Sequence, residues 1–227
     1  MAVAFDVASN AGGDGVSSVT WSHTCTGTGT DGFIRIAAGW QDNVAISSMT
    51  YNGTAGTVIG QANNSTLKHS AMRYVLVPTT GAHNCVVTFA SAVSNIVCGA
   101  SSFTGVNQTT PVDGLQTGTG SGTGPSVTVT TSATGDMVID ACYNNASSAG
   151  WTAGASQTEE WDRNDSAGFA HGGGSREAGA ASVTMNWTTA FGDWAHVACN
   201  INAAGAAPKS LPIFRPSLRL RTRRRFA

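Results

Sequence analysis

Short apolar runs alternate with segments rich in Gly, Ser and Thr along the whole chain. The clearest run covers residues 95–103 and reads NIVCGASSF, which is β-prone and has the length of one strand. Because neighbouring residues of a strand point to opposite faces, an unbroken apolar run predicts a strand that is buried on both faces. The chain then turns polar at Thr104 and Gly105 and reaches a Pro-Val-Asp-Gly turn.

A hairpin is predicted in the first quarter of the chain. Residues 44–51 alternate between two sets of side chains, as a strand with two different faces does. Asn52 and Gly53 follow, a dipeptide typical of a type I′ turn because both positions of that turn need a positive φ. We expect residues 57–61 to be the returning strand.

Further strands follow before the run at 95–103. Residues 69–77 predict a buried strand, which Pro78 ends because proline cannot donate to a β-ladder. Residues 85–89 predict a strand that pairs with 95–103 in a second hairpin. No repeat of short period is evident along the chain.

The pattern predicts an all-β fold with residues 1–207 in one domain. About a dozen short strands at roughly even spacing are typical of a two-sheet antiparallel β-sandwich of jelly-roll type. Residues 117–125, reading TGTGSGTGP, are interpreted as a flexible loop that crosses within this sandwich. The alternative is a linker at this place between two smaller domains. Residues 208–227 are predicted to be an extended, basic C-terminal arm.

Composition favours strands over helices. Charged residues make up 11% of the chain, against about 25% in typical soluble domains. The 28 Gly residues disfavour helix interiors, whereas six Trp and eight Phe argue against a disordered chain. No apolar segment approaches the roughly 20 residues that span a bilayer, so we expect no membrane contact.

The cysteines predict buried free thiols. They are widely spaced, with no C-x-x-C pair and no adjacent His: Cys25, Cys85, Cys98, Cys142 and Cys199. Most lie within apolar strand patterns, where Cys behaves as a small core residue. Because free thiols persist in reducing compartments, we expect the chain to fold in a cytoplasm.

Four segments resemble a class of β-sandwich domains found in structural proteins of tailed bacteriophages and in some bacterial surface proteins. They are residues 49–54 (MTYNGT), 102–111 (SFTGVNQTTP), 135–140 (GDMVID) and 192–197 (GDWAHV). The resemblance implies proteins that decorate capsids or build fibres, often as homotrimers. It implies no catalytic residue and no cofactor.

The densest acidic patch is the run from Glu159 to Asp162, with Asp165 close behind. Glycosidases use paired carboxylates, but Glu159 and Glu160 are adjacent on a strand and therefore point to opposite faces. We interpret the patch as an exposed strand end. Residues 162–165 lack the alternating ligand spacing of a calcium loop, so no metal is predicted.

No catalytic motif is present elsewhere. The five His residues show no H-x-H or H-E-x-x-H grouping, and there is no G-x-S-x-G. His196 lies in the alternating run 194–201 and is expected to be a partly buried, hydrogen-bonded side chain. We therefore predict that the chain is not an enzyme.

Tryptophans are candidates for stacking against sugars. Trp40, Trp187 and Trp194 lie in predicted strands and are assigned to the core. Trp151 lies in a polar loop and is the one expected to be exposed, and Trp161 lies in the acidic patch. Trp151 and Trp161 are therefore the candidate glycan contacts.

The arm at 208–227 carries charge opposite to the rest of the chain. It holds seven of the twelve basic residues, whereas the body has 5 basic and 13 acidic residues, a net charge of −8. Its three prolines exclude a continuous helix, and its apolar side chains are not needed by a solvated tail. We predict that it docks on another protein subunit through Phe214, Arg215, Leu218, Arg219, Leu220, Arg221, Arg223, Arg224 and Arg225.

Two other interpretations of the arm stay open. One is a solvated basic terminus, and the other is a segment that neutralises nucleic-acid phosphates. The acidic body opposes contact with nucleic acid, so nucleic acid is not among the predicted partners.

These features predict a non-enzymatic virion structural protein that decorates or cements a phage capsid and is anchored by its basic arm. Its partners would be capsid subunits and further copies of itself, as a homotrimer. Its location would be the virion, after folding in the host cytoplasm. The alternative is a phage tail-fibre or adhesin module that binds surface glycans through loop aromatics.

Overall fold

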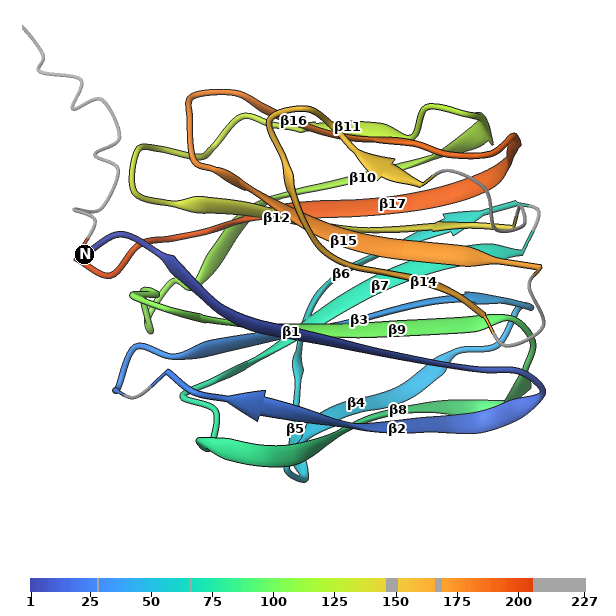
Figure 1. The fold of residues 1–227 in the computed structure, drawn as a ribbon, viewed down its shortest axis with the longest axis horizontal. Helices are drawn as coiled ribbons and strands as arrows, with labels where there is room; N and C mark the ends of the chain where they lie inside the picture. Colours follow the sequence, from blue (N-terminus) through green and yellow to red (C-terminus); the bar gives the residue numbers. More distant parts are fainter. Residues whose placement is uncertain (28, 66, 146–150, 166–168, 206–227) are drawn as a thin grey trace, which may run out of the picture.

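A computed structural model of the chain describes residues 1–27, 29–65, 67–145, 151–165 and 169–205. Within these ranges the fold is all-β and its strands form four antiparallel sheets (Figure 1). The predicted all-β fold of packed antiparallel sheets is confirmed, although the sheets number four instead of two. The predicted arm, with all of its docking residues from Phe214 to Arg225, lies outside the described residues.

The first half of the chain forms two sheets. A five-stranded sheet has the order β1-β9-β3-β7-β6, and a four-stranded sheet has the order β2-β8-β4-β5. The strand bounds are β1 (Ala4–Gly13), β2 (Val16–Cys25), β3 (Phe33–Gln41), β4 (Ile46–Tyr51), β5 (Thr54–Ala55), β6 (Thr57–Asn64), β7 (Lys68–Leu76), β8 (Gly81–Val93) and β9 (Ile96–Thr104).

The second half forms two further sheets. A five-stranded sheet has the order β10-β17-β12-β15-β14, and a three-stranded sheet has the order β11-β16-β13. The strand bounds are β10 (Val112–Gly122), β11 (Ser126–Val129), β12 (Met137–Asn144), β13 (Thr152–Ala153), β14 (Thr158–Asn164), β15 (His171–Ala178), β16 (Val183–Thr188) and β17 (Gly192–Ile201).

The second half repeats the topology of the first. When β1 is equated with β10 and β9 with β17, the order β1-β9-β3-β7-β6 becomes β10-β17-β12-β15-β14. The outer sheets correspond in the same way, with β2-β8-β4 matching β11-β16-β13. The repeated unit is half of the described chain, which is why a search for a short period does not find it.

The two five-stranded sheets face each other at the centre of a four-layer stack (Figure 1). Apolar side chains from both sheets meet there, among them Phe33 and Phe103 from the first half and Val197 and Ile201 from the second. Separate apolar clusters lie between each central sheet and its outer sheet. The central strands are consequently covered on both faces, and β9 is buried over Ile96–Phe103, as the apolar run 95–103 predicts.

Large aromatic rings of the second central sheet pack against glycines of the first. A Cβ atom at Gly99 would lie 2.1 Å from the Trp161 ring, and one at Gly39 would lie 2.4 Å from the Tyr143 ring. Contacts this short are impossible for a real side chain, so only glycine allows the two sheets to approach this closely. These positions bring Trp161 into the interface between the halves.

Two predicted strand pairings are wrong. The turn at Asn52 and Gly53 is present, with φ values of 48° and 77°, but its returning strand is the short β5, while β6 pairs with β7 in the central sheet. The predicted hairpin of 85–89 with 95–103 is also absent, because β8 and β9 belong to facing sheets. The link between β8 and β9 carries the chain from one layer to the next.

The flexible loop predicted at 117–125 is wrong for residues 117–122. Residues up to Gly122 belong to β10, which pairs with β17. Gly118 and Gly120 lie against the Trp194 ring, where added Cβ atoms would come within 3.3 and 2.7 Å of ring carbons. The alternating glycines therefore form a packing surface. Trp194, assigned to the core by its sequence, is only partly buried in this position.

The described chain begins and ends at the same end of the stack (Figure 1). The Met1 ammonium group donates to the Ala204 carbonyl at 2.8 Å, and the Ala204 N–H donates to the Gly105 carbonyl at 2.7 Å. The Ala203 N–H donates to Asp136 Oδ1 at 2.9 Å. Both halves thus hold the segment that leads to Gly205.

Candidate functional site

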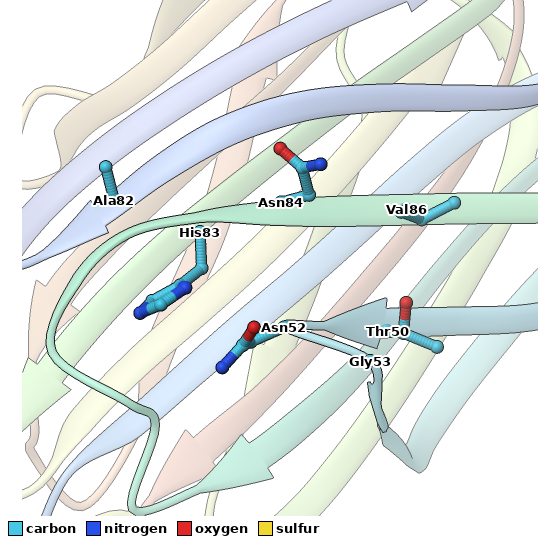
Figure 2. A pocket seen from close by; sticks show the side chains of 7 residues that line it. All are labelled: Thr50, Asn52, Gly53, Ala82, His83, Asn84 and Val86. Atoms are coloured by element: carbon cyan, nitrogen blue, oxygen red, sulfur yellow. The ribbon is translucent and has the colours of Figure 1, made fainter.

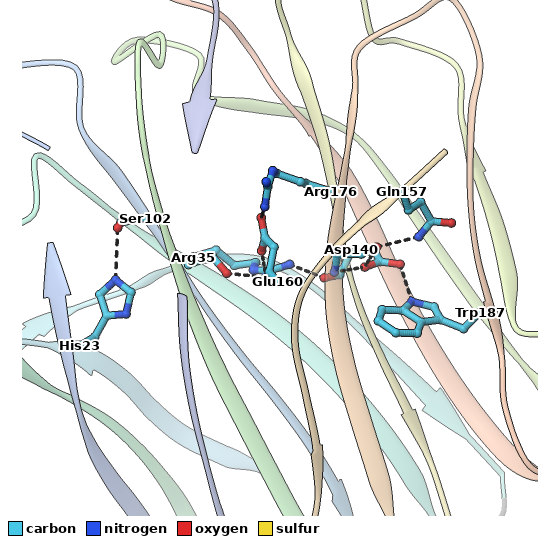
Figure 3. A network of polar contacts seen from close by, with 10 residues as sticks. His23, Arg35, Ser102, Asp140, Gln157, Glu160, Arg176 and Trp187 are labelled. Atoms are coloured by element: carbon cyan, nitrogen blue, oxygen red, sulfur yellow. Dashed lines mark hydrogen bonds and ion pairs between the residues drawn. The ribbon is translucent and has the colours of Figure 1, made fainter. Parts of the chain in front are cut away.

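Arg35 joins the two halves of the molecule (Figure 3). It lies on β3 and is fully buried, and its Nη2 lies 2.5 Å from Glu160 Oε2 on β14. Nη2 also donates to Ser101 Oγ at 2.8 Å, and Nη1 donates to the backbone carbonyl of Asp140. Arg176 Nη1 lies 3.6 Å from Glu160 Oε1. The buried carboxylate is therefore held between one arginine from each half.

Asp140 is the centre of a second buried network, within the second half. It accepts hydrogen bonds from the Ser175 N–H and Oγ, from Trp187 Nε1 and from His196 Nε2, all at 2.7–2.8 Å. Asp140, Ser175 and His196 have no exposed surface. A serine nucleophile would donate to histidine, but here Ser175 donates to the aspartate. The predicted hydrogen bonding of His196 is confirmed, and its burial is complete.

A third network ties together strands of the first half. Ser102 Oγ donates to Asp6 Oδ2 at 2.7 Å and lies 3.2 Å from His23 Nε2, while His23 Nδ1 lies 2.8 Å from Ser9 Oγ. Burial lowers the pKa of His23 to about 4, and the nearby Asp6 carboxylate only partly opposes this shift. The imidazole is therefore neutral near pH 7. Ser102 is 1% exposed, so these groups link β1, β2 and β9 instead of facing a substrate.

The acidic patch at 159–162 is divided between surface and interior. Glu159 is exposed, whereas the Glu160 side chain is fully buried. The prediction that they point to opposite faces is confirmed, but the interpretation of the whole patch as an exposed strand end is wrong. Arg35, the single charge within the apolar run FIRIAA, was the available signal, because a charge on a strand covered on both faces needs a buried partner.

Neither candidate glycan contact presents a free ring. Trp151 is 7% exposed. Its ring stacks on His171, with ring centroids 4.7 Å apart, and packs against Trp187, with ring centroids 5.4 Å apart. The expected exposure of Trp151 is therefore wrong. Trp161 is 4% exposed because it is enclosed over Gly99 between the two central sheets.

The assignments of Trp40 and Trp187 to the core are confirmed, with at most 1% of each residue exposed. The most exposed aromatic side chains of the described residues are instead Phe169 and Phe191, at 66% and 77%. Both belong to connecting segments next to strands of the second half.

Among the described residues, two of the surface hollows are considered as sites. One has a volume of about 410 Å³ and lies beside the β4–β5 turn on the four-stranded sheet (Figure 2). It is lined by Thr50, Asn52, Gly53, Ala82, His83, Asn84 and Val86. The other has a volume of about 560 Å³ and lies between the loop after β3 and the β6–β7 hairpin.

All five cysteines are free and buried, as predicted. Burial raises the pKa of Cys199 to about 12, with the Arg35 charge opposing the shift. Its thiol is therefore protonated and unreactive near neutral pH. Burial raises the pKa of the other four thiols as well.

The part of the chain that the structure describes holds no group of three or more His, Cys, Asp or Glu side chains that could bind a metal ion. In the same residues no helix has the length and apolar character needed to cross a membrane. Comparison with known proteins finds no matching family model, no matching curated protein and no matching solved structure.

Proposed function

We propose that the chain is a non-enzymatic virion structural protein that decorates or cements a phage capsid and is anchored by residues 208–227. The observation that carries this proposal is the fully buried contact of Arg35 with Glu160 at the centre of the stack. Ionisable groups of this kind serve chemistry when they face a cleft, but here they link two sandwiches into one block. Two sandwiches that are joined by a buried ion pair suit a protein that must resist mechanical load.

We further propose that each half is a jelly roll. The support is the strand order of the first half, with β1-β9-β3-β7 in one sheet, β6 as a ninth strand at the edge of that sheet, and β2-β8-β4-β5 in the facing sheet. Eight strands interleaved between two sheets are typical of this architecture, which is common in viral capsid and lectin domains. By analogy of architecture, this fold supports a role in a capsid.

The proposed anchor follows Gly205, at the end of the stack that carries Met1. Its seven basic residues and its apolar side chains fit an acidic partner surface with apolar pockets on a capsid subunit. Attachment at one end would leave the opposite end of the stack facing outward. The proposed assembly is a homotrimer in the virion, formed after folding in the host cytoplasm.

Truncation tests the proposal. Full-length chain and a chain lacking residues 208–227 would each be added to undecorated particles, and occupancy measured by cryo-electron microscopy. The full chain should occupy defined capsid positions, and the truncated chain should fold but leave them empty. Full occupancy by the truncated chain would show that the arm is not the anchor.

The alternative of an adhesin that binds glycans through Trp151 and Trp161 is not favoured. Both rings are covered by protein on their faces, so neither offers the apolar platform that a sugar ring requires.

A further inference from the structure

The larger hollow has the dimensions of a binding site. Its volume of about 560 Å³ falls within the range of roughly 300–1,000 Å³ that is usual for small-molecule sites. It lies at the end of the central sheet where Gln41 pairs with Lys68, whereas Met1 lies near the other end, where Phe33 pairs with Leu76 (Figure 1). It is lined by Asn43, Val44, Ala45, Gln61, Asn63, Asn64, Ser65, Leu67 and His69.

The loop after β3, which forms one wall of this hollow, is fixed by hydrogen bonds to its backbone and to Asp42. Trp40 Nε1 donates to the Val44 carbonyl at 3.0 Å, and the Val44 N–H donates to the Asp42 carbonyl at 2.9 Å. Asp42 Oδ2 accepts from the Ser94 N–H at 2.9 Å. These contacts fix the backbone of the loop that carries Asn43 without using the Asn43 side chain, so its exposed amide is left to contact a ligand.

The opposite wall is held by side chains. Asn63 Oδ1 accepts from Gln61 Nε2 at 2.5 Å and lies 2.8 Å from His69 Nδ1. The His69 ring stacks on Trp40, with ring centroids 4.8 Å apart. These contacts leave Asn63 Nδ2 and Gln61 Oε1 without a hydrogen bond to any described residue, on side chains that are exposed.

Two of the five non-glycine residues with positive φ in the described chain border this hollow. Asp42 and Leu67 have positive φ values of 83° and 67°, and they lie at the turns that border the two walls. Non-glycine residues in this region are uncommon and cluster at functional sites. The strain at Leu67 holds an apolar side chain that is 43% exposed at the rim of the hollow.

The free groups of the hollow define its ligand. Amide side chains both donate and accept hydrogen bonds, and no acidic side chain, lysine or arginine is among the lining residues. Burial lowers the pKa of His69, so the imidazole is neutral near pH 7. Val44, Ala45 and Leu67 add apolar surface next to the amides. An uncharged ligand with many hydroxyl groups and an apolar C–H face matches this arrangement.

We propose that this hollow binds a neutral saccharide, with Asn43, Gln61 and Asn63 contacting its hydroxyl groups and Leu67 packing against its ring. The inference does not depend on the arm or on capsid attachment. A scaffold that is held at its Met1 end would present this site at its other end.

A glycan array that holds neutral and acidic saccharides would be probed with the full chain, and the strongest neutral ligand titrated by calorimetry. Asn43→Ala and Gln61→Ala should each weaken binding about fivefold, the value of one lost hydrogen bond. Asn43 makes no side-chain hydrogen bond within the described fold, so the thermal stability of Asn43→Ala should match that of the wild type.

The matched control is Asn84→Ala, which removes an exposed amide from the hollow of Figure 2 and should leave affinity unchanged. Loss of binding in Asn84→Ala, with normal binding in Asn43→Ala, would move the site to that hollow and overturn the proposal. Binding of acidic glycans alone, or of no glycan, would overturn it as well. Because capsid occupancy is measured separately, failure here is distinct from failure of the scaffold proposal.

Discussion

Replacing Glu160 by Gln removes a carboxylate that two arginines share where the halves of the molecule meet. Glu160 has no exposed side-chain surface, and neither has Arg35. The substitution keeps the shape of the side chain and deletes its charge, which leaves the Arg35 guanidinium buried with only neutral partners, Ser101 Oγ and the Asp140 carbonyl.

The expected loss follows from that burial. Breaking a buried ion pair by removing one partner typically costs about 3–5 kcal/mol, because the remaining charge stays desolvated. Arg35→Met should cost less than Glu160→Gln, because Glu160 would keep Arg176 at 3.6 Å, a residue whose side chain is 20% exposed. Replacing both partners, as Arg35→Met with Glu160→Leu, should recover much of the loss, since the two fully buried charges are both removed and the Arg176 charge that loses its partner is 20% exposed.

Urea unfolding followed by tryptophan fluorescence measures these effects as changes in midpoint and slope. The matched control is Glu159→Gln, the neighbouring carboxylate on the exposed face, which should change stability by no more than about 0.5 kcal/mol. Because the pair bridges the halves, Glu160→Gln should also separate their unfolding transitions. A loss below about 1 kcal/mol with a single transition would show that the ion pair does not hold the halves together.

Three further outcomes are expected. Phe103 is 1% exposed and packs edge-to-face against Phe33 at 6.1 Å, so Phe103→Ala should cost about 3–5 kcal/mol in the same assay; a loss below about 1 kcal/mol would contradict its place in the core. The pKa of His23 is about 4 in the folded chain and 6.5 in the unfolded chain, so the unfolded chain binds the proton more readily. The stability that the neutral, buried His23 contributes is therefore fully present above pH 6.5 and is lost as pH falls toward about 4. The free energy of unfolding of the wild type should fall by about 3 kcal/mol over this pH range, and His23→Gln should lack this decrease. Equal slopes of unfolding free energy against pH for the two proteins would refute the expectation. For the arm, Phe214→Ala combined with Leu218→Ala should release the protein from particles in high salt while the wild type stays bound, because apolar burial resists the screening that weakens exposed Arg contacts above ~0.15 M; equal salt sensitivity would mean that these side chains are not buried on docking.

Local features of the chain were predictable because residues close in the sequence decide them. The type I′ turn at Asn52 and Gly53 needs positive φ at both positions, and few other dipeptides supply that. The apolar run at 95–103 required cover on both faces, and the structure provides it from the sheets on either side. The burial of the five thiols followed from their place in apolar strands.

The partners of each strand depended on the tertiary structure. In a four-layer stack, β8 and β9 meet apolar surfaces whichever sheet they join, so their polarity does not specify a layer. Sequence reasoning therefore paired them as a hairpin. The repetition of topology between the halves was hidden for a related reason, because a strand order arises from contacts distant in sequence.

The burial of individual side chains also depended on the tertiary structure. Glu160 reads as a surface residue until Arg35, 125 positions away in the chain, lies beside it. Trp161 is covered because Gly99 of the facing sheet has no side chain, and Gly118 and Gly120 lie in a strand on which Trp194 packs. The local sequence pattern determines which way a side chain points along a strand, but the sheet that it meets there comes from residues distant in the sequence.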